Sequence, residues 1–233
     1  MSLAPLHPWT LEPQEALRLQ ERLREQLTLR WDGRPVATVG GVDVHLAGEQ
    51  GRAAIVVLSF PQLSPLTAAV AETPLRFPYI PGLLAFREGP AVLAAWERLT
   101  IKPDLLLFDG QGIAHPRRLG IAAHLGLWLE TPSIGVAKSR LYGRHAAVGE
   151  RPGDRAELWD EGDPTLQLGF ALRTRERCNP LYVSPGHLID LEHALAFTLA
   201  CVRGYRLPEP TRRAHLAAGG ARPAPLDADG TGF

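Results

Sequence analysis

The sequence predicts a protein of the α/β class, because one central stretch reads as a strand, a glycine-rich loop, a helix and a second strand. This stretch covers residues 104–143, and its apolar run Leu105–Phe108 has the length and composition of a buried strand. Residues 117–130 partly follow helical spacing, and the strand-like run Ser133–Ala137 comes next. A strand, a helix and a further strand in this order form a βαβ unit, which is typical of α/β proteins.

Three more strands are predicted ahead of this unit, after an N-terminal helix. The helix is expected over residues 13–30, with Pro13 in its first turn and apolar side chains along one face. Residues 36–46 alternate between apolar and polar types, and residues 53–60 form a second strand after a glycine-containing turn. Residues 66–72 add a third strand. The three strands together predict an antiparallel meander.

A segment that fits no regular element lies between the meander and the central stretch. Pro78 and Pro81 hold its backbone near extended or polyproline geometry, so Tyr79 and Ile80 are displayed on a stiff loop. A helix is expected to follow over residues 83–99. The sequence thus predicts a rigid, apolar loop directly ahead of a helix.

The pattern is weaker after the central stretch. Residues 145–150 and 165–174 are expected to form two strands, joined by the polar, turn-rich link of residues 149–164. Residues 181–183 form a further short extended piece. The sheet is therefore expected to continue, with irregular connections.

A final helix is predicted over the apolar positions of residues 188–202. Ser184 is expected to cap its N-terminus, with Pro185 in the first turn. From about Gly219 the apolar content is too low to order the chain. We therefore expect one domain over residues 1–218 and a disordered C-terminal tail over residues 219–233.

Composition limits the classes of function. The chain has 25 basic and 25 acidic residues and no net charge, which argues against a nucleic-acid binder held by overall basicity. No apolar run approaches the ~20 residues that a membrane-spanning helix needs, and the N-terminus lacks the pattern of a secretory signal. We therefore expect a cytoplasmic protein with no membrane partner, in which any phosphate binding comes from local clusters.

Three carboxylates stand on separate predicted elements: Asp43, Glu88 and Asp109. Asp43 lies in a strand on the face opposite Val42 and Val44, where an ionised side chain needs a partner or a cation. Asp109 ends a buried strand, a common position for sites in α/β proteins. If the three converge, their oxygens form a site for Mg²⁺. Each also has an ordinary explanation: an arginine partner for Asp43, a favourable helix N-terminal charge for Glu88 and a turn cap for Asp109.

The same stretch contributes two further polar residues, His115 and Lys138. In the ordinary reading, His115 caps the following helix, Lys138 is a solvated strand end, and His187 is a first-turn residue of the last helix. In favour of a functional role, Lys138 belongs to the densest group of basic residues near Asp109. The other members of that group are Arg117, Arg118, Arg140 and Arg144.

Several long motifs then occur in one order along the chain. They are GGVDV around Asp43, FPYIPGLLAFREGP around Glu88, DGQGIAHPRRLGIAAHLG after Asp109, PSIGVAKSRLYG around Lys138, SPGH at 184–187 and RLPEPTRRAH at 206–215. In this combination the sequence resembles endonuclease V, the family of deoxyinosine 3′ endonucleases. The resemblance covers nearly the whole chain apart from the first residues and the tail.

This resemblance implies a ribonuclease H-like fold, with a mixed central sheet and helices on both faces. It also implies that Asp43 and Asp109 bind Mg²⁺, for which Mn²⁺ is a possible substitute, and that Glu88 completes the acidic set. Lys138 and His115 match positions near the scissile phosphate. His187 matches a position that supports the acidic site.

Two further groups of residues follow from the resemblance. Pro78, Tyr79, Ile80 and Pro81 match a wedge that enters the base stack, so that the damaged base can turn out into a pocket. Glycines in the pocket wall let the backbone approach the base closely. The matching pocket residues are Leu84, Gly110, Gly120, Ile121, Gly135 and Leu141.

The implied reaction is Mg²⁺-dependent hydrolysis of the second phosphodiester 3′ to deoxyinosine, which leaves 3′-hydroxyl and 5′-phosphate ends. The implied partner is damaged DNA, and we expect the protein to act as a monomer. One alternative is the same chemistry on inosine in RNA. Another is a non-catalytic nucleic-acid binder, against which the presence of Asp43, Glu88 and Asp109 argues.

Overall fold

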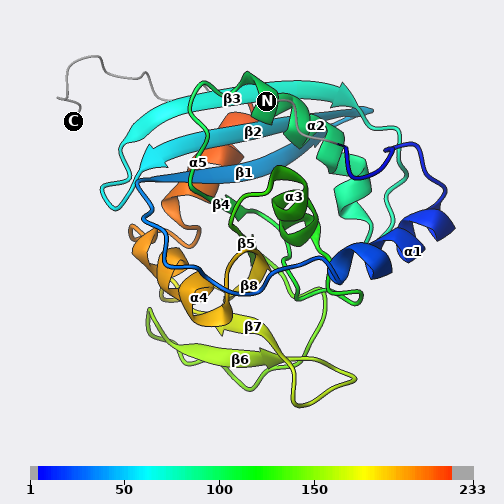
Figure 1. Ribbon diagram of the computed structural model, residues 1–233. Helices are drawn as coiled ribbons and strands as arrows, with labels where there is room; N and C mark the ends of the chain where they lie inside the picture. The colour runs from blue at the N-terminus through cyan, green and yellow to red at the C-terminus, as the bar shows by residue number, and fades with distance from the viewer. Residues whose placement is uncertain (1–4, 222–233) are drawn as a thin grey trace.

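The computed structural model describes residues 5–221 of the chain. In this part, helices surround one eight-stranded sheet with the strand order β3-β2-β1-β4-β5-β8-β7-β6 (Figure 1). The predicted α/β class is confirmed. In chain order the elements are α1 (Pro13–Arg24), β1 (Thr38–Ala47), β2 (Gln50–Ser59), β3 (Pro65–Pro74), α2 (Leu84–Arg98), β4 (Leu105–Phe108), α3 (Ile121–Leu129), β5 (Ser133–Ala137), β6 (Arg155–Trp159), β7 (Gln167–Leu172), β8 (Leu181–His187), α4 (Leu191–Ala200) and α5 (Glu209–Ala218).

The sheet is mixed, as the resemblance implies. β1, β2 and β3 form the predicted antiparallel meander. β4 lies parallel to β1, and β5 lies parallel to β4, so the predicted βαβ unit is present as β4, α3 and β5. β8 is antiparallel to β5. The carboxyl ends of β1, β4 and β5 therefore meet at the same edge of the sheet.

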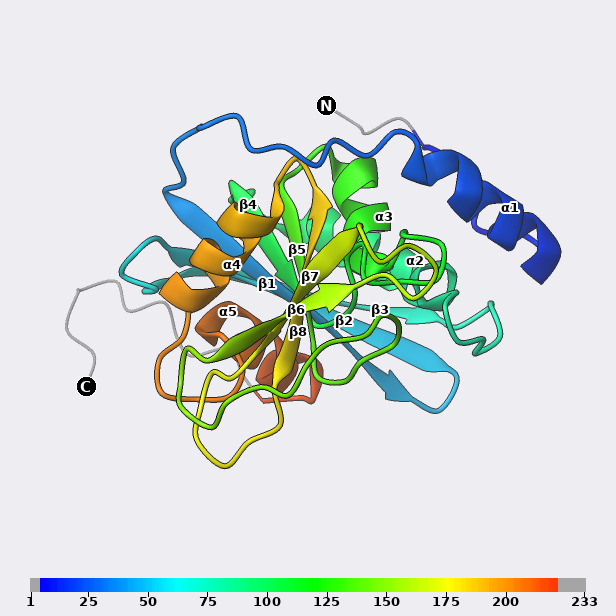
Figure 2. The ribbon, with the colours of Figure 1, turned by 90° about the horizontal axis from the view of Figure 1, so that it is seen from below.

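Alternate side chains of β4 enter two separate apolar cores. Leu105 and Leu107 pack in the core that contains residues of α4 and α5, whereas Leu106 and Phe108 pack in the core that contains residues of α2 and α3. A strand that is buried on both faces explains the unbroken apolar run in the sequence. Figure 2 shows the result, with α2 and α3 on one side of the sheet and α4 and α5 on the other.

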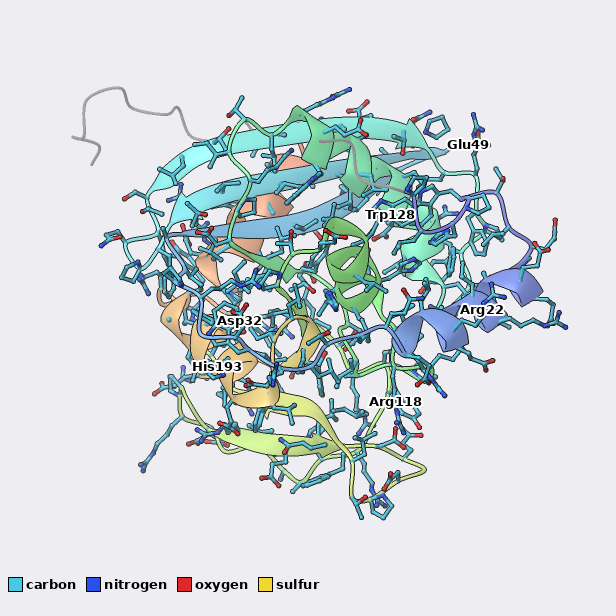
Figure 3. All side chains as sticks on the ribbon, in the orientation of Figure 1. Arg22, Asp32, Glu49, Arg118, Trp128 and His193 are labelled. Atoms are coloured by element: carbon cyan, nitrogen blue, oxygen red, sulfur yellow. The ribbon has the colours of Figure 1, made fainter. Side chains whose placement is uncertain are left out.

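The helix α1 packs beside α3 and closes a third apolar core. Leu19 and Leu23 of α1 lie there with Leu119, which precedes α3. Trp128 of α3, labelled in Figure 3, stacks on Trp9 ahead of α1, with the ring centroids 4.8 Å apart. These contacts fix the N-terminal region against the segment that leads into α3.

Two helices are shorter than the sequence predicts. α1 ends at Arg24, because the chain then turns away and the Thr28 N–H donates to His187 Nδ1 at 3.2 Å. α3 begins at Ile121 instead of residue 117, because Arg118 has a φ of 56°, which an α-helix cannot contain. Residues 117–120 instead form a loop that precedes α3.

The strand predicted over residues 145–150 is wrong. Beside it the chain makes one isolated bridge between Arg144 and Trp159, and residues 145–150 have no regular pairing. β6 lies instead within the segment predicted as a link. β6 is a five-residue edge strand with turn-forming glycine, proline and aspartate residues on both sides, so its short alternation does not stand out from the surrounding polar segment.

Ser184 does not cap a helix. It lies in β8, which continues through Pro185 to His187, and its Oγ accepts a hydrogen bond of 2.9 Å from the Gly112 N–H. A register shift in the pairing of β5 with β8 accommodates the proline, which lacks an N–H for the ladder. α4 begins only at Leu191, where the Asp190 side chain accepts from the His193 N–H and caps it.

The C-terminal helix α5 is an element that the sequence analysis does not predict. Glu209 and Pro210 stand in its first turn, where an acidic side chain and a proline favour a helix start. Of the predicted tail, residues 222–233 lie outside the described residues. No helix within residues 5–221 is long and apolar enough to cross a membrane.

Candidate metal centre and base pocket

The register of the sheet brings Asp43 and Asp109 together. Val42 of β1 pairs with Phe108 of β4, and the Asp109 N–H donates to the Val42 carbonyl at 2.9 Å. Each aspartate is the residue after one member of this pair, so the two side chains lie beside each other on neighbouring parallel strands. Asp43 is on the face opposite Val42, as the alternation in the sequence predicts.

A third residue reaches the two carboxylates from α5. Gly41 allows the start of this helix to lie against β1, because a Cβ at this position would stand 1.9 Å from the Pro210 carbonyl oxygen. His215, one and a half turns further along α5, places its Nδ1 2.9 Å from Oδ2 of Asp43. Potential ligand atoms of Asp43, Asp109 and His215 all lie within 4.8 Å of one another. We call these three residues the ligand group.

Lys138 stands beside the ligand group at the end of β5. Its Nζ forms an ion pair with Oδ2 of Asp109 and lies 3.5 Å from Nδ1 of His215. Two donors hold the backbone on either side of this lysine. Arg206 donates to the Lys138 carbonyl at 2.6 Å, and Gln111 donates to the Ser139 carbonyl at 2.9 Å. The structure thus brings the predicted residues Asp43, Asp109 and Lys138 together.

Glu88 approaches the same place from α2 but is not a member of the ligand group. Its side chain is buried, and burial together with the charges of Asp43 and Asp109 raises the pKa of Glu88 to about 8. Burial and Asp43 also raise the pKa of Asp109, although Lys138 and His215 partly oppose this shift. The carboxylate cluster is therefore electrostatically unfavourable when it is fully ionised.

The donor set fits a divalent cation. Three carboxylates converge, and Lys138 forms an ion pair with one of them, Asp109. Hard divalent ions such as Mg²⁺ prefer carboxylate oxygens, and Mn²⁺ also accepts an imidazole. A bound divalent cation would remove the repulsion that raises the pKa of Glu88. The ligands that the geometry favours are Asp43, Asp109 and His215, with Glu88 beside them.

A cavity of about 340 Å³ opens next to Asp109 and Lys138. Five of the six predicted pocket residues line it: Leu84, Gly110, Gly120, Ile121 and Leu141. Gly135 lies behind the cavity wall instead, where a Cβ would stand 2.1 Å from the Gly112 backbone nitrogen. This glycine lets the loop after β4 pack against β5. The pocket and the carboxylate cluster are therefore parts of one continuous site.

The predicted wedge residues form the rim of this cavity. Tyr79, Ile80 and Pro81 line the cavity, whereas Pro78 faces another hollow near Trp9. Tyr79 is 67% exposed, and Ile80 packs partly against the core beneath α1. An exposed aromatic side chain on a loop held by prolines thus stands at the mouth of the cavity. Residues 78–82 are called the Tyr79 loop below.

His115 lies beneath the Tyr79 loop with both ring nitrogens in hydrogen bonds. Its Nε2 donates to the Gly82 carbonyl at 2.9 Å, and its Nδ1 accepts from the Arg117 N–H at 3.1 Å. Burial, helped by the charge of Arg117, lowers the pKa of His115 to about 4, so the ring is neutral. His115 lines the same cavity as Asp109 and Lys138, and its predicted place near the scissile phosphate stays a prediction.

His187 lies away from the carboxylates. It pairs with Ser133 at the start of β5, whereas Lys138 follows the other end of that strand. Its Nδ1 accepts from the Thr28 N–H, and burial lowers the pKa of His187 to about 4. Within residues 5–221 the hydrogen bonds of the His187 ring do not lead to the carboxylates, so its predicted support of the acidic site stays a prediction, and the histidine that contacts Asp43 is His215.

Sequence analysis does not assign roles to His215, Gln20 or Gln111. His215 stands in the quoted run RLPEPTRRAH, whose proline and glutamate mark a helix start. Gln20 is a polar residue on the apolar face of a predicted helix and is 1% exposed in the structure. That placement is the signal that could have identified it, because a buried amide needs polar partners.

The fold and the site together indicate a class of enzyme. A mixed α/β sheet carries carboxylates on adjacent parallel strands, with a lysine and a cavity beside them. This arrangement is suited to an enzyme that uses a divalent cation on a phosphate ester. The sequence model of the Endonuclease V family matches residues 18–216, and the chain belongs to this family. It is therefore a nuclease of the hydrolase class.

Individual relatives agree over nearly the full length. Endonuclease V of Alkalilimnicola ehrlichii is 49% identical over 228 residues, which cover 97% of this chain and 99% of that protein. The solved structure of endonuclease V from Streptomyces avermitilis has a TM-score of 0.84 and 42% identity, and covers 91% of this chain and 93% of its own. The ribonuclease H-like fold that the resemblance implies is thereby confirmed.

One solved relative contains a nucleic acid. It is Ciona intestinalis endonuclease V in complex with a 24mer DNA that contains an inosine followed by a ribo-adenosine. It has a TM-score of 0.75 and 28% identity, and covers 88% of this chain and 95% of its own.

Proposed function

We propose that this protein nicks DNA at deoxyinosine by Mg²⁺-dependent hydrolysis of the second phosphodiester 3′ to the lesion, leaving 3′-hydroxyl and 5′-phosphate ends. The observation that carries the proposal is the continuity of the carboxylate cluster with a base-sized cavity through Asp109 and Lys138. A damaged base in the cavity would place the strand that follows it next to the cation ligands. Recognition and hydrolysis would then take place in one connected site.

Asp43, Asp109 and His215 would hold the cation, for which Mg²⁺ or Mn²⁺ has suitable chemistry. When bound, such an ion activates water and stabilises the charge that develops on a phosphoryl group. Glu88 would orient the attacking water and accept its proton, because its carboxylate stands beside the ligand group without belonging to it. Lys138 would exchange its contact with Asp109 for one with the phosphate and offset negative charge there.

The cavity would read hypoxanthine through the backbone. Gly110 and Gly120 line it without side chains, so amide and carbonyl groups can approach the edge of the base. Hypoxanthine carries a carbonyl and a ring N–H where adenine carries an amino group, which gives these backbone groups a basis for discrimination. Tyr79 and its neighbours would enter the base stack and keep the strand open at the lesion.

Hydrolysis of inosine-containing RNA is the alternative. The observation that favours it is the ribo-adenosine after the inosine in the complex of the Ciona intestinalis relative. Matched DNA and RNA strands that differ only in the sugar on the 3′ side of the inosine separate the two proposals. Faster single-turnover cleavage of the DNA strand supports the deaminated-DNA substrate. Faster cleavage of the ribonucleotide-containing strand supports the RNA substrate.

A further inference from the structure

The Tyr79 loop ends at a carbonyl group that three side chains bind. The Gly82 carbonyl oxygen accepts hydrogen bonds from Gln20 Nε2, His115 Nε2 and Arg117 Nη2, each 2.9 Å long. A carbonyl oxygen has two lone pairs, so its capacity is fully used here. Gly82 has a φ of 81°, and a Cβ at this residue would lie 2.6 Å from Nη2 of Arg117. The end of the loop is therefore held in one position from three directions.

Gln20 connects this carbonyl to the wall of the cavity. Its Nε2 also donates to the Leu119 carbonyl at 3.1 Å, just ahead of Gly120 in the cavity wall. Its Oε1 accepts from Nε of Arg117 at 2.5 Å. All the hydrogen-bonding atoms of this buried amide thus contact the loop, the wall or the arginine between them. The amide is a bridge between the two parts of the site that would contact the lesion.

The packing of α1 does not require an amide at this position. Ala16, Leu19 and Leu23 bury the apolar face of the helix against the core that contains Leu119. A buried amide adds a desolvation cost that only well-formed hydrogen bonds offset. At Gln20 every one of those bonds points to the site instead of to α1 itself. The contacts therefore link this side chain to the geometry of the site more directly than to the packing of the helix.

We propose that Gln20, together with Arg117, is a positioning residue for lesion recognition, which fixes the Tyr79 loop at a set height above the cavity wall. This inference rests on the proposed function, since it assumes that the loop opens a duplex at the lesion. Insertion of the loop between base pairs costs a few kcal/mol of unstacking per step. A mobile loop would also have to be ordered at the lesion, so it would hold the opened strand less well. A single strand has no duplex to open, so its cleavage depends on the bridge much less.

The test uses the full-length protein and compares cleavage at one deoxyinosine in a duplex with cleavage of the same strand without its complement. Gln20→Met keeps the side-chain volume and removes the hydrogen bonds, and Leu23→Ala is a matched control that truncates a buried residue of the same helix. Single-turnover cleavage is measured with Mg²⁺ on a deoxyinosine duplex and on the same strand alone. For Gln20→Met we expect a roughly tenfold slower duplex reaction and a roughly twofold or smaller change on the single strand. Leu23→Ala should leave the ratio of the two rates unchanged.

A double-mutant cycle shows whether Gln20 acts through the loop. Tyr79→Ala alone should also slow the duplex reaction selectively. Both changes impair the insertion of the Tyr79 loop into the duplex. The double variant Gln20→Met/Tyr79→Ala should therefore cleave duplex little more slowly than Tyr79→Ala alone. Multiplicative effects in the double variant would overturn the inference, and so would equal losses of Gln20→Met on duplex and on single strand.

A second variant protects the test against misfolding of Gln20→Met. Arg117→Lys keeps the positive charge but loses the planar fork that contacts both the Gly82 carbonyl and Gln20. The same duplex-selective loss is expected, and an unchanged ratio of rates in Arg117→Lys overturns the inference. If the wild-type protein cuts neither inosine substrate, the proposed function fails. If it cuts both and the variants show no duplex selectivity, the positioning role alone fails.

Discussion

The carboxylate cluster and the Tyr79 loop lie on the same cavity, but different contacts hold them in place. Asp43 and Asp109 follow paired residues of β1 and β4, so the backbone ladder of the sheet sets the distance between them. The Tyr79 loop has no regular secondary structure, and side chains from α1 and from the segment before α3 hold its end. The chemical centre is thus built on the rigid sheet, whereas the recognition element depends on a few side-chain hydrogen bonds.

This difference predicts that substitutions in the two regions separate catalysis from recognition. Changes in the cluster should reduce the rate of hydrolysis and leave lesion binding in place. Changes around the loop should reduce discrimination and leave the chemistry in place. The following variants test that separation, starting with the largest expected effect.

Asp109→Ala should reduce nicking of inosine DNA by at least ~10³-fold, because it removes a cation ligand and with it several kcal/mol of charge stabilisation. Binding of inosine DNA should persist, since the cavity and the Tyr79 loop remain. Single-turnover cleavage and a binding titration on the same duplex check both halves. Undiminished cleavage by this variant would place the chemical centre elsewhere in the protein.

Glu88→Gln should inactivate the enzyme but stabilise the metal-free protein at alkaline pH. The folded-state pKa of Glu88, about 8, lies above the ordinary value of 4.5. The folded state then binds more protons than the unfolded state between these values, so this group lowers stability as pH rises through them. The amide does not titrate, and its advantage should therefore grow to a few kcal/mol by pH 8.

Urea unfolding in the presence of a chelator, at pH 5 and at pH 8, measures this effect. The wild-type protein is the reference at each pH. A stability difference between Glu88→Gln and wild type that is the same at both pH values would contradict a Glu88 side chain that is buried near the other two carboxylates.

His215→Ala and His187→Ala distinguish the histidine that lies at the site from the one that the resemblance implies. His215→Ala should lower the rate by ~10²-fold and raise the concentration of Mg²⁺ or Mn²⁺ needed for half-maximal activity, as expected for a lost ligand contact. His187→Ala should leave the metal dependence unchanged, because His187 contacts Thr28 and β5 instead. Metal titrations of both variants decide the assignment, and a shifted metal dependence in His187→Ala alone would reverse it.

Tyr79→Ala should weaken binding of inosine duplex roughly tenfold, which corresponds to the ~1–3 kcal/mol of a base–aromatic contact. Binding of undamaged duplex should change less, because phosphate contacts dominate it. Titrations of the two duplexes at one salt concentration give the ratio. Equal losses on both would show that the loop does not act at the lesion.

The parts of the fold that the sequence predicts are those with a strong local pattern. Asp43 lies within an apolar strand, Asp109 directly follows another, and the helix that carries Glu88 has a clear apolar face. β6 escapes prediction because it is a five-residue edge strand inside a polar, turn-rich segment. Ser184 is misassigned because a serine followed by a proline resembles a helix start, while the pairing with β5 that keeps it in β8 is a long-range contact.

The same reasoning applies to the site. Asp43 lies in β1, whereas Asp109 and Lys138 directly follow β4 and β5, so the sheet topology alone brings them together. His215 depends on the approach of α5 to Gly41 of β1, a contact across most of the chain that no local pattern reveals. Gln20 and His115 depend in the same way on the carbonyl of Gly82. The local sequence pattern predicts the strands that carry polar residues. Long-range tertiary contacts decide which of these polar side chains lie together.

The most direct test of the central claim is a nicking assay on the wild-type protein with an inosine-containing duplex and its undamaged counterpart. With Mg²⁺, one nick at the second phosphodiester 3′ to the inosine is expected, and a chelator should abolish it until Mg²⁺ is restored. Cleavage that persists in chelator, or that is equally fast on undamaged duplex, would contradict the account of a cation-dependent centre joined to a lesion pocket.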